Sequence, residues 1–254
     1  MHIPGRFARA PDAMRLRFPD DALRLEKLGH RLRGDFVDRE DAIQRLIGTA
    51  QGPLQYFYNL AFRLGGYRNV VLCCSYYCLR NELVGSNMPV PPVAAHVDHG
   101  RIVCSREMRI VNSCFSTRRN RPVTALTRIK LRRYASTEPL YEPYLAALLI
   151  ALAQQQWRTV QSTTRTQASG VKPKLLYSSD DTEFMHLYTT QVSSTLMTMF
   201  DDPSFAPPSP ESLSIQAVTI LYKPLETLRD RLLALVLESS SLGGIDKSDN
   251  LITY

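Results

Sequence analysis

PVTALTRIKLRRYASTEPLYEPYLAALLIALAQQQW, residues 122–157, joins a basic segment to the most apolar helix that the sequence predicts. Apolar residues fall on alternate positions through much of residues 123–134, and this period of two predicts a strand with one buried and one solvated face. After Pro139, apolar residues occupy nearly all sides of residues 141–157, which is typical of a buried helix. The apolar run Tyr144–Ala153 is about half of the roughly 20 residues that a membrane span needs. We therefore expect a core helix and no membrane association.

Length and composition indicate an ordinary globular protein. The chain has 254 residues, of which 44% are hydrophobic and 22% charged. Its five cysteines are an odd number without the spacing of a small secreted domain, so we expect reduced thiols. The three in the apolar run around Cys74 are expected to be buried and inert. No convincing targeting segment precedes residue 35, and we expect an intracellular protein, cytoplasmic or nuclear.

The pattern along the chain predicts the α+β class: a mixed β-sheet with a buried central helix, an N-terminal helical pair and a C-terminal strand–helix unit. The helical pair is residues 38–50 and 54–64, where apolar residues recur at helical spacing. The C-terminal unit is a strand over 213–222 and a helix that begins at Pro224. We predict a single domain over residues 37–238, with a loosely structured basic arm before it (1–36) and a flexible tail after it (239–254).

A hairpin is predicted from residues 93–97 and 101–111, with Asp98-His99-Gly100 as its turn. His96 and His99 are suitable metal ligands, but on a strand they would point to opposite faces. We interpret this segment as an exposed turn and predict no metal site there.

The positive charge is concentrated in one segment. The net charge is +7, and seven cations lie between Arg118 and Arg133 with no acid among them. Such a patch is what nucleic acid or an acidic protein would meet, whereas the alternative is a solvated strand face whose acids lie elsewhere in space. The leading hypothesis is a non-catalytic binding or regulatory protein. The predicted binding residues are Arg118, Arg119, Arg121, Arg128, Lys130, Arg132 and Arg133.

The predicted order of helix, hairpin, strand, helix and strand over residues 92–178 resembles the core of PD-(D/E)XK nuclease-like domains. The resemblance implies phosphodiester hydrolysis with bound Mg²⁺ or Mn²⁺ as the alternative function. The residues that match the family's catalytic positions are Glu107, or Asp98 in its place, together with Lys130 and Gln154. The acid-x-Lys motif is degenerate, because Arg128 stands two residues before Lys130 where the family has an acid. Outside this alternative we expect no cofactor.

Residues 55–238 are also similar in texture to uncharacterised proteins of filamentous fungi, as in LLYSSDDTEFMHLYTTQV and VTILYKPLETLRDRLL. This resemblance implies one continuous domain and no particular activity. A third hypothesis is an enzyme of unknown class that acts on small molecules, with its pocket between the buried helix and the proline-rich loop 201–211.

Overall fold

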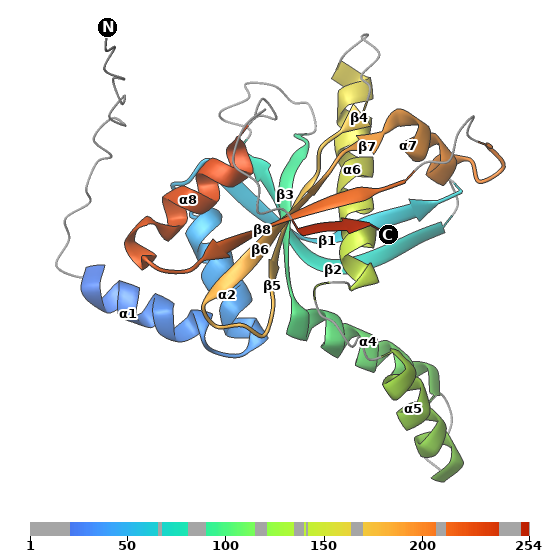
Figure 1. Cartoon of the computed structure of the whole chain (residues 1–254), viewed down its shortest axis with the longest axis horizontal. Coiled ribbons are helices and arrows are strands. Elements are labelled where there is room, and N and C mark those ends of the chain that lie inside the picture. Colours follow the sequence, from blue (N-terminus) through green and yellow to red (C-terminus); the bar gives the residue numbers. More distant parts are fainter. Residues whose placement is uncertain are drawn as a thin grey trace, which may run out of the picture.

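A sheet of seven strands with helices on both faces organises the protein (Figure 1). The computed structural model describes residues 21–65, 68–80, 90–114, 121–134, 140, 142–163, 170–206, 212–238 and 250–253. Across the sheet the strands are β1 (Leu54–Leu64), β2 (Arg68–Leu79), β3 (Pro92–Asp98), β5 (Lys174–Ser178), β6 (Phe184–Thr190), β8 (Ser214–Leu221) and β9 (Asn250–Thr253). Two short strands, β4 (Gly170–Val171) and β7 (Val192–Ser193), pair separately.

Neighbouring strands of the sheet are antiparallel except β3 and β5, which are parallel, so the sheet is mixed as predicted. A parallel pair needs a crossover connection, and here three helices provide it. They are α4 (His99–Cys114), α5 (Arg121–Tyr134) and α6 (Pro143–Thr163). The remaining helices are α1 (Asp21–Leu32), α2 (Phe36–Ile47), α7 (Ser194–Asp201) and α8 (Leu225–Leu237). Together these elements confirm the α+β class.

The two faces of the sheet are covered by different helices. Helix α6 packs on one face, whereas α1, α2 and α8 pack on the other. Strand β5 shows the division, because Leu175 and Tyr177 join the core under α6 while Leu176 joins the core under α2 and α8. A strand buried on both faces gives a continuous apolar run rather than an alternating pattern.

Helix α6 confirms the prediction of a buried helix. Leu145, Leu148, Leu149 and Leu152 have no exposed surface. None of the described helices is both long and apolar enough to span a membrane.

Two other predictions are confirmed: a helix in the first segment of the predicted N-terminal pair, and the C-terminal strand–helix unit. Helix α2 begins earlier than expected. Its N-cap is Asp35, whose carboxylate accepts hydrogen bonds from the backbone N–H groups of Val37 (2.9 Å) and Asp38 (3.0 Å).

Residues 54–64 are strand β1 rather than the predicted second helix of the pair, and α1 is instead the partner of α2. The aromatic run Tyr56–Tyr58 has high strand propensity, and β1 pairs along its length with β2. The pairing is irregular between Tyr58 and Leu60, and Asn59 between them has a φ of 66°. Long-range pairing has therefore overridden the local period.

Residues 101–111 and 123–134 are also helical, so the predicted hairpin partner and the predicted central strand are both wrong. In α5 the less exposed residues recur at helical rather than strand spacing: Val123, Thr127 and Leu131 are four residues apart. Thr127 is 5% exposed and its hydroxyl donates to the carbonyl oxygen of Val123 at 2.8 Å. The alternation of apolar and basic residues was compatible with both periods.

The predicted terminal segments contain regular structure where they are described. Residues 21–32 form α1 inside the predicted loose arm, and residues 250–253 form β9, which pairs with β8, inside the predicted tail. Residues 1–20 and 239–249 lie outside the described residues.

Candidate functional site

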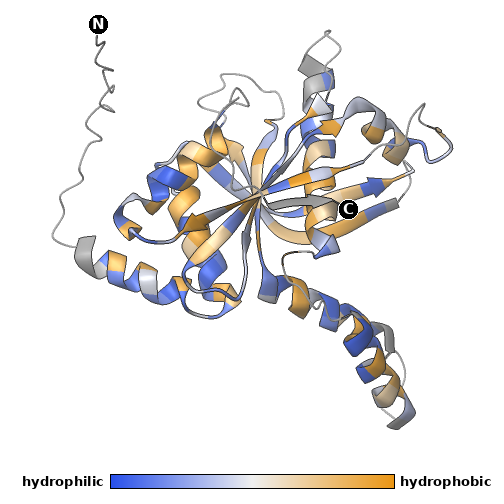
Figure 2. Cartoon of the chain, in the orientation of Figure 1, coloured by the Kyte–Doolittle hydropathy of each residue, from blue (hydrophilic) through white to orange (hydrophobic). Residues whose placement is uncertain are grey.

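The described part of the predicted basic segment lies on α5, one of two helices that extend away from the sheet. Figure 1 shows α4 leaving the end of β3 and α5 packed beside it, and we call this pair the helical arm. Helix α5 contains no acidic residue, and Figure 2 shows hydrophilic and hydrophobic positions mixed along the arm. The arm is therefore the place where a basic surface is presented to solvent.

The outward face of α5 combines aliphatic and basic side chains. Leu126 is 56% exposed and Ile129 is 60% exposed, and their spacing of three residues puts them on one face with Arg133. Arg128 and Arg132, four residues apart, lie along one side of this face, and Lys130 lies on the other side. The face thus has an apolar centre with cations around it.

These four cations are exposed, and among the described residues none has an acidic side chain within 4.0 Å. The cations of α4 are used differently. Arg101 pairs with Glu40 and Arg106 with Glu142, both at 2.5 Å, and Arg109 donates to the carbonyl oxygen of Val71 at 2.7 Å. The arginines of α4 attach the arm to the body, whereas Arg128, Arg132 and Arg133 of α5 are exposed to solvent.

The remaining predicted binding residues precede this face. Arg121 is the first residue of α5, whereas Arg118 and Arg119 lie outside the described residues.

The residues of the nuclease alternative lie on three different helices. Glu107 and Lys130 are exposed on α4 and α5, not on the strands where they were placed. Gln154 is buried on α6, where its amide accepts from the backbone N–H of Arg63 (3.0 Å) and donates to the Arg63 carbonyl oxygen (2.9 Å). Both Oε1 and Nε2 of Gln154 thus bind the backbone of the edge strand β1, and neither atom is directed to a metal-bound water.

A second concentration of polar side chains lies where the parallel strands β3 and β5 end. Asp98, the last residue of β3, has no exposed surface and forms a bidentate pair with Arg39 of α2, at 2.6 Å to Nε and 2.9 Å to Nη2. The hydrogen bonds that Arg39 donates to Asp98 raise the pKa of Arg39 above its already high value. The segment predicted as an exposed turn is therefore the buried anchor of α2.

Beside this pair, Nε2 of His96 lies 2.9 Å from the hydroxyl of Ser178, and the Tyr222 hydroxyl lies 3.5 Å from the same Ser178 oxygen. The distance between His96 and Ser178 is that of a nucleophile and its base. Neither side chain has exposed surface, however, so no substrate reaches them. Burial, with the nearby charge of Arg39, lowers the pKa of His96 to about 3, so the imidazole is neutral at physiological pH.

Only the outer edge of this cluster reaches solvent. Asp180 is 73% exposed in its side chain and lies 3.9 Å from both Arg39 and His99. The other ring nitrogen of His99, Nδ1, lies 3.0 Å from the Tyr177 hydroxyl. The described residues contain no group of three His, Cys, Asp or Glu side chains placed to hold a metal ion.

The described cysteines form no disulfide. Cys74 and Cys78 are buried as predicted, whereas Cys73 is partly exposed, so the prediction is wrong for this residue. Burial raises the pKa of Cys74 to about 12 and that of Cys78 to about 11, so both are protonated and poor nucleophiles.

No protein-family model matches this chain, and no curated protein or solved structure matches it either. Function is therefore argued from the geometry of the molecule alone.

The sequence located the cations but missed the two aliphatic side chains that share their face. Leu126 and Ile129 are separated by three residues, a helical spacing that the strand interpretation placed on different faces. The buried pair of Asp98 and Arg39 joins residues 59 positions apart, so no local pattern announces it. The available signal was that Asp98 and Ser178 each end an apolar run.

Proposed function

We propose that the protein is a non-catalytic binding protein whose helical arm docks an acidic segment of another protein. One observation carries this proposal: two aliphatic side chains more than half exposed, Leu126 and Ile129, lie among four cations that have no acidic partner among the described residues. A protein interface has this arrangement, with an apolar centre and a polar rim.

The apolar centre favours a protein over nucleic acid as the partner. A phosphate backbone would pair with Arg128 and Arg132 but would leave Leu126 and Ile129 in water. An acidic amphipathic helix would satisfy both, because its apolar side chains would cover Leu126 and Ile129 while its carboxylates met the cations. Charge complementarity would speed association and fix the orientation of the partner.

The attachment of the arm also supports binding by a preformed surface. Arg101 and Arg106 connect α4 to buried carboxylates of the body, Glu40 and Glu142, whose side chains are 6% and 3% exposed. A surface held in place before binding loses less conformational freedom when the partner docks.

The test is fluorescence anisotropy with three labelled probes at about 50 mM and about 200 mM salt. The probes are an amphipathic helical peptide of leucine and glutamate, an oligoglutamate of equal charge, and a DNA duplex. We expect the amphipathic peptide to bind at least about tenfold more tightly than oligoglutamate, because burial of apolar surface adds to charge pairing.

Two double variants separate the contributions. Arg128→Gln with Arg132→Gln should weaken peptide binding and reduce its salt dependence, whereas Leu126→Ser with Ile129→Ser should weaken binding and leave the salt dependence unchanged. The matched control is Arg24→Gln with Lys27→Gln, which removes two exposed cations from α1.

Equal binding of the peptide and oligoglutamate, or no effect of the serine variant, would contradict the proposed apolar contact. Tighter binding of the DNA duplex than of the peptide would identify the arm as a nucleic-acid surface instead. No binding of any probe at low salt would reject the arm as a site for acidic partners.

A further inference from the structure

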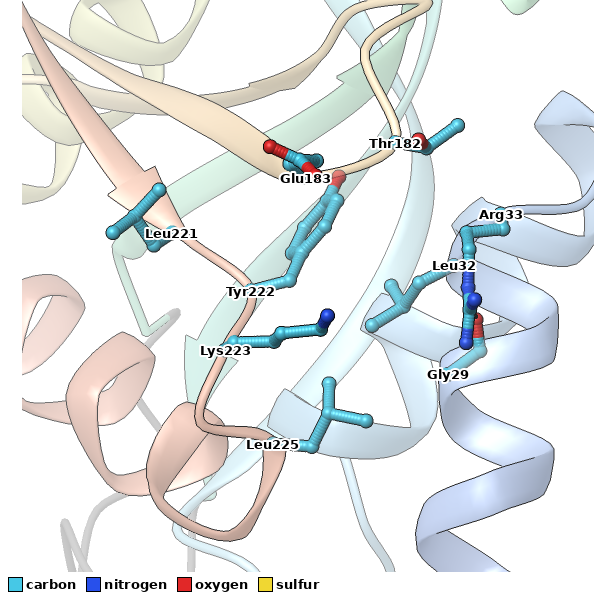
Figure 3. A pocket seen from close by; sticks show the side chains of 9 residues that line it. All are labelled: Gly29, Leu32, Arg33, Thr182, Glu183, Leu221, Tyr222, Lys223 and Leu225. Carbon is cyan, nitrogen blue, oxygen red and sulfur yellow. Dashed lines mark hydrogen bonds between the residues drawn. The ribbon is translucent and has the colours of Figure 1, made fainter.

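A cavity of about 290 Å³ lies on the α1, α2 and α8 face of the sheet, away from the helical arm. Three segments surround it: the end of α1, the turn before β6, and the turn between β8 and α8 (Figure 3). Sites for small molecules are usually about 300 to 1,000 Å³, so this cavity suits a ligand near the lower limit.

Apolar groups form much of the cavity wall and are fixed in place. Leu32 is 1% exposed and Tyr222 is 2% exposed, and both belong to the core on this face of the sheet. The backbone N–H of Tyr222 donates to the carbonyl oxygen of Glu183 at 2.8 Å. Because the Tyr222 hydroxyl also lies 3.5 Å from Ser178, its ring is held at both ends.

A glycine on α1 allows the cavity walls to approach one another. A Cβ atom at Gly29 would lie 3.1 Å from Cδ1 of Leu225 and 3.2 Å from Nη2 of Arg33. Glycine is disfavoured inside helices, but here it gives room to an arginine and a leucine that both line the cavity.

Two cations and one acid line the cavity. Figure 3 shows Lys223 reaching from the β8–α8 turn toward α1, where Arg33 lies along the helix. Nε of Arg33 donates to the Gly29 carbonyl oxygen at 2.9 Å, and this contact uses one of the five guanidinium N–H groups. Within the described part of the chain, neither cation has a carboxylate within 4.0 Å. Glu183 is the acid of the lining.

We propose that this cavity binds a small organic anion, a carboxylate or phosphate monoester with an apolar body. The body would pack against Leu32, Tyr222 and Leu225, and the anionic group would accept hydrogen bonds from Arg33 and Lys223. Arginine suits such a group because its planar N–H groups can meet two oxygens at once. This site is independent of the helical arm.

The test uses fluorine NMR with para-fluorophenylacetate and para-fluorophenyl phosphate as anionic probes. The matched neutral probe is para-fluorophenylacetamide, and the matched cation is para-fluorophenethylamine. We expect both anions to bind with millimolar Kd, as befits fragments of this size. The neutral amide should bind about tenfold more weakly, because it lacks the charge-assisted hydrogen bonds. The tighter of the two anions identifies the preferred acidic group.

Variants place the binding site. Lys223→Gln and Arg33→Gln should each weaken binding of the anions about tenfold, whereas Lys27→Gln, an exposed cation on the same helix as the cavity wall, should not change it. Thr182→Trp should abolish binding by filling the cavity from an exposed turn. The unfolding transition of each variant confirms that it is folded.

Three results would overturn the proposal. They are equal binding of the amide and the anions, anion binding that survives Thr182→Trp in a folded protein, and no detectable binding of either anion at millimolar concentration.

Discussion

The arginines of α2 and α5 show two uses of the same side chain. Arg39 on α2 is 7% exposed and gives two hydrogen bonds to the buried carboxylate of Asp98. Arg128 and Arg132 on α5 are exposed, without an acidic partner in the described part of the chain. The first arginine connects a helix to the sheet, whereas the other two contribute nothing to the packing around them.

The difference teaches that charge density along a sequence does not locate the charges on which the fold depends. Helix α2 has two arginines with acidic residues beside them, so its sequence shows no concentration of positive charge. One of these arginines, Arg39, nevertheless pairs with the fully buried carboxylate of Asp98. Removal of one partner from such a buried pair leaves an uncompensated charge, whereas removal of an exposed cation leaves only water in its place.

The largest expected effect is that of Asp98→Ala. This substitution leaves the Arg39 guanidinium buried without its carboxylate, so we expect the free energy of unfolding to fall by about 3 to 5 kcal/mol. Urea denaturation followed by circular dichroism measures the change. The matched control is Asp180→Ala, which removes an acid that is 73% exposed and 3.9 Å from the same guanidinium, with an expected change within about 0.5 kcal/mol. Similar costs for the two variants would show that burial does not distinguish them.

A smaller effect is expected from pH, because His96 is buried in its neutral form. Its folded-state pKa is about 3 and its ordinary value is 6.5, so between these values the unfolded chain binds a proton that the folded chain does not. The contribution of neutral His96 to stability is therefore fully present above pH 6.5. Below this pH the free energy of unfolding falls, and the slope approaches about 1.4 kcal/mol per pH unit. His186, whose pKa burial also lowers, adds a contribution in the same direction.

Urea denaturation between pH 7.5 and pH 5 in wild-type protein and His96→Gln isolates the contribution of His96. We expect the variant to lose about 2 kcal/mol less than the wild type across the part of this range below pH 6.5. The control His30→Gln changes an exposed histidine on α1 and should keep the wild-type slope. Parallel slopes in all three proteins would show that His96 takes up a proton in the folded state.

The sequence predicted the elements whose burial is the same on every side. Helix α6 is apolar nearly all round, so its identification did not depend on choosing a face. Together with β8 and α8 of the C-terminal unit, it was enough to give the α+β class. The arrangement of the sheet was not accessible in this way, because the parallel pairing of β3 with β5 joins residues about 80 positions apart.

The wrong assignments of secondary structure lie in segments whose apolar residues fit both the strand period and the helix period. In 123–134 the apolar positions satisfy alternation, yet Val123, Thr127 and Leu131 also satisfy helical spacing, and packing on α4 selects the helix. In 54–64 the reverse happened, since pairing with β2 selects the strand. The basic residues of the candidate site are close together in the sequence, but their arrangement around Leu126 and Ile129 depends on the helix that was missed.

The smallest expected effect completes the comparison of the two kinds of arginine. Replacement of Arg128, Lys130, Arg132 and Arg133 together by glutamine should change the free energy of unfolding by no more than about 0.5 kcal/mol. Two small effects oppose each other. Loss of the repulsion between Arg128 and Arg132, four residues apart, should stabilise the helix by about 0.2 to 0.5 kcal/mol, whereas loss of Arg132 and Arg133 from the last turn removes a favourable interaction with the helix dipole of about 0.3 to 1 kcal/mol. Urea denaturation at low salt measures the net change, and added salt should reduce it by screening both interactions. A loss of several kcal/mol would mean that these cations support the fold as Arg39 does, and α5 would then no longer be a surface free to bind a partner.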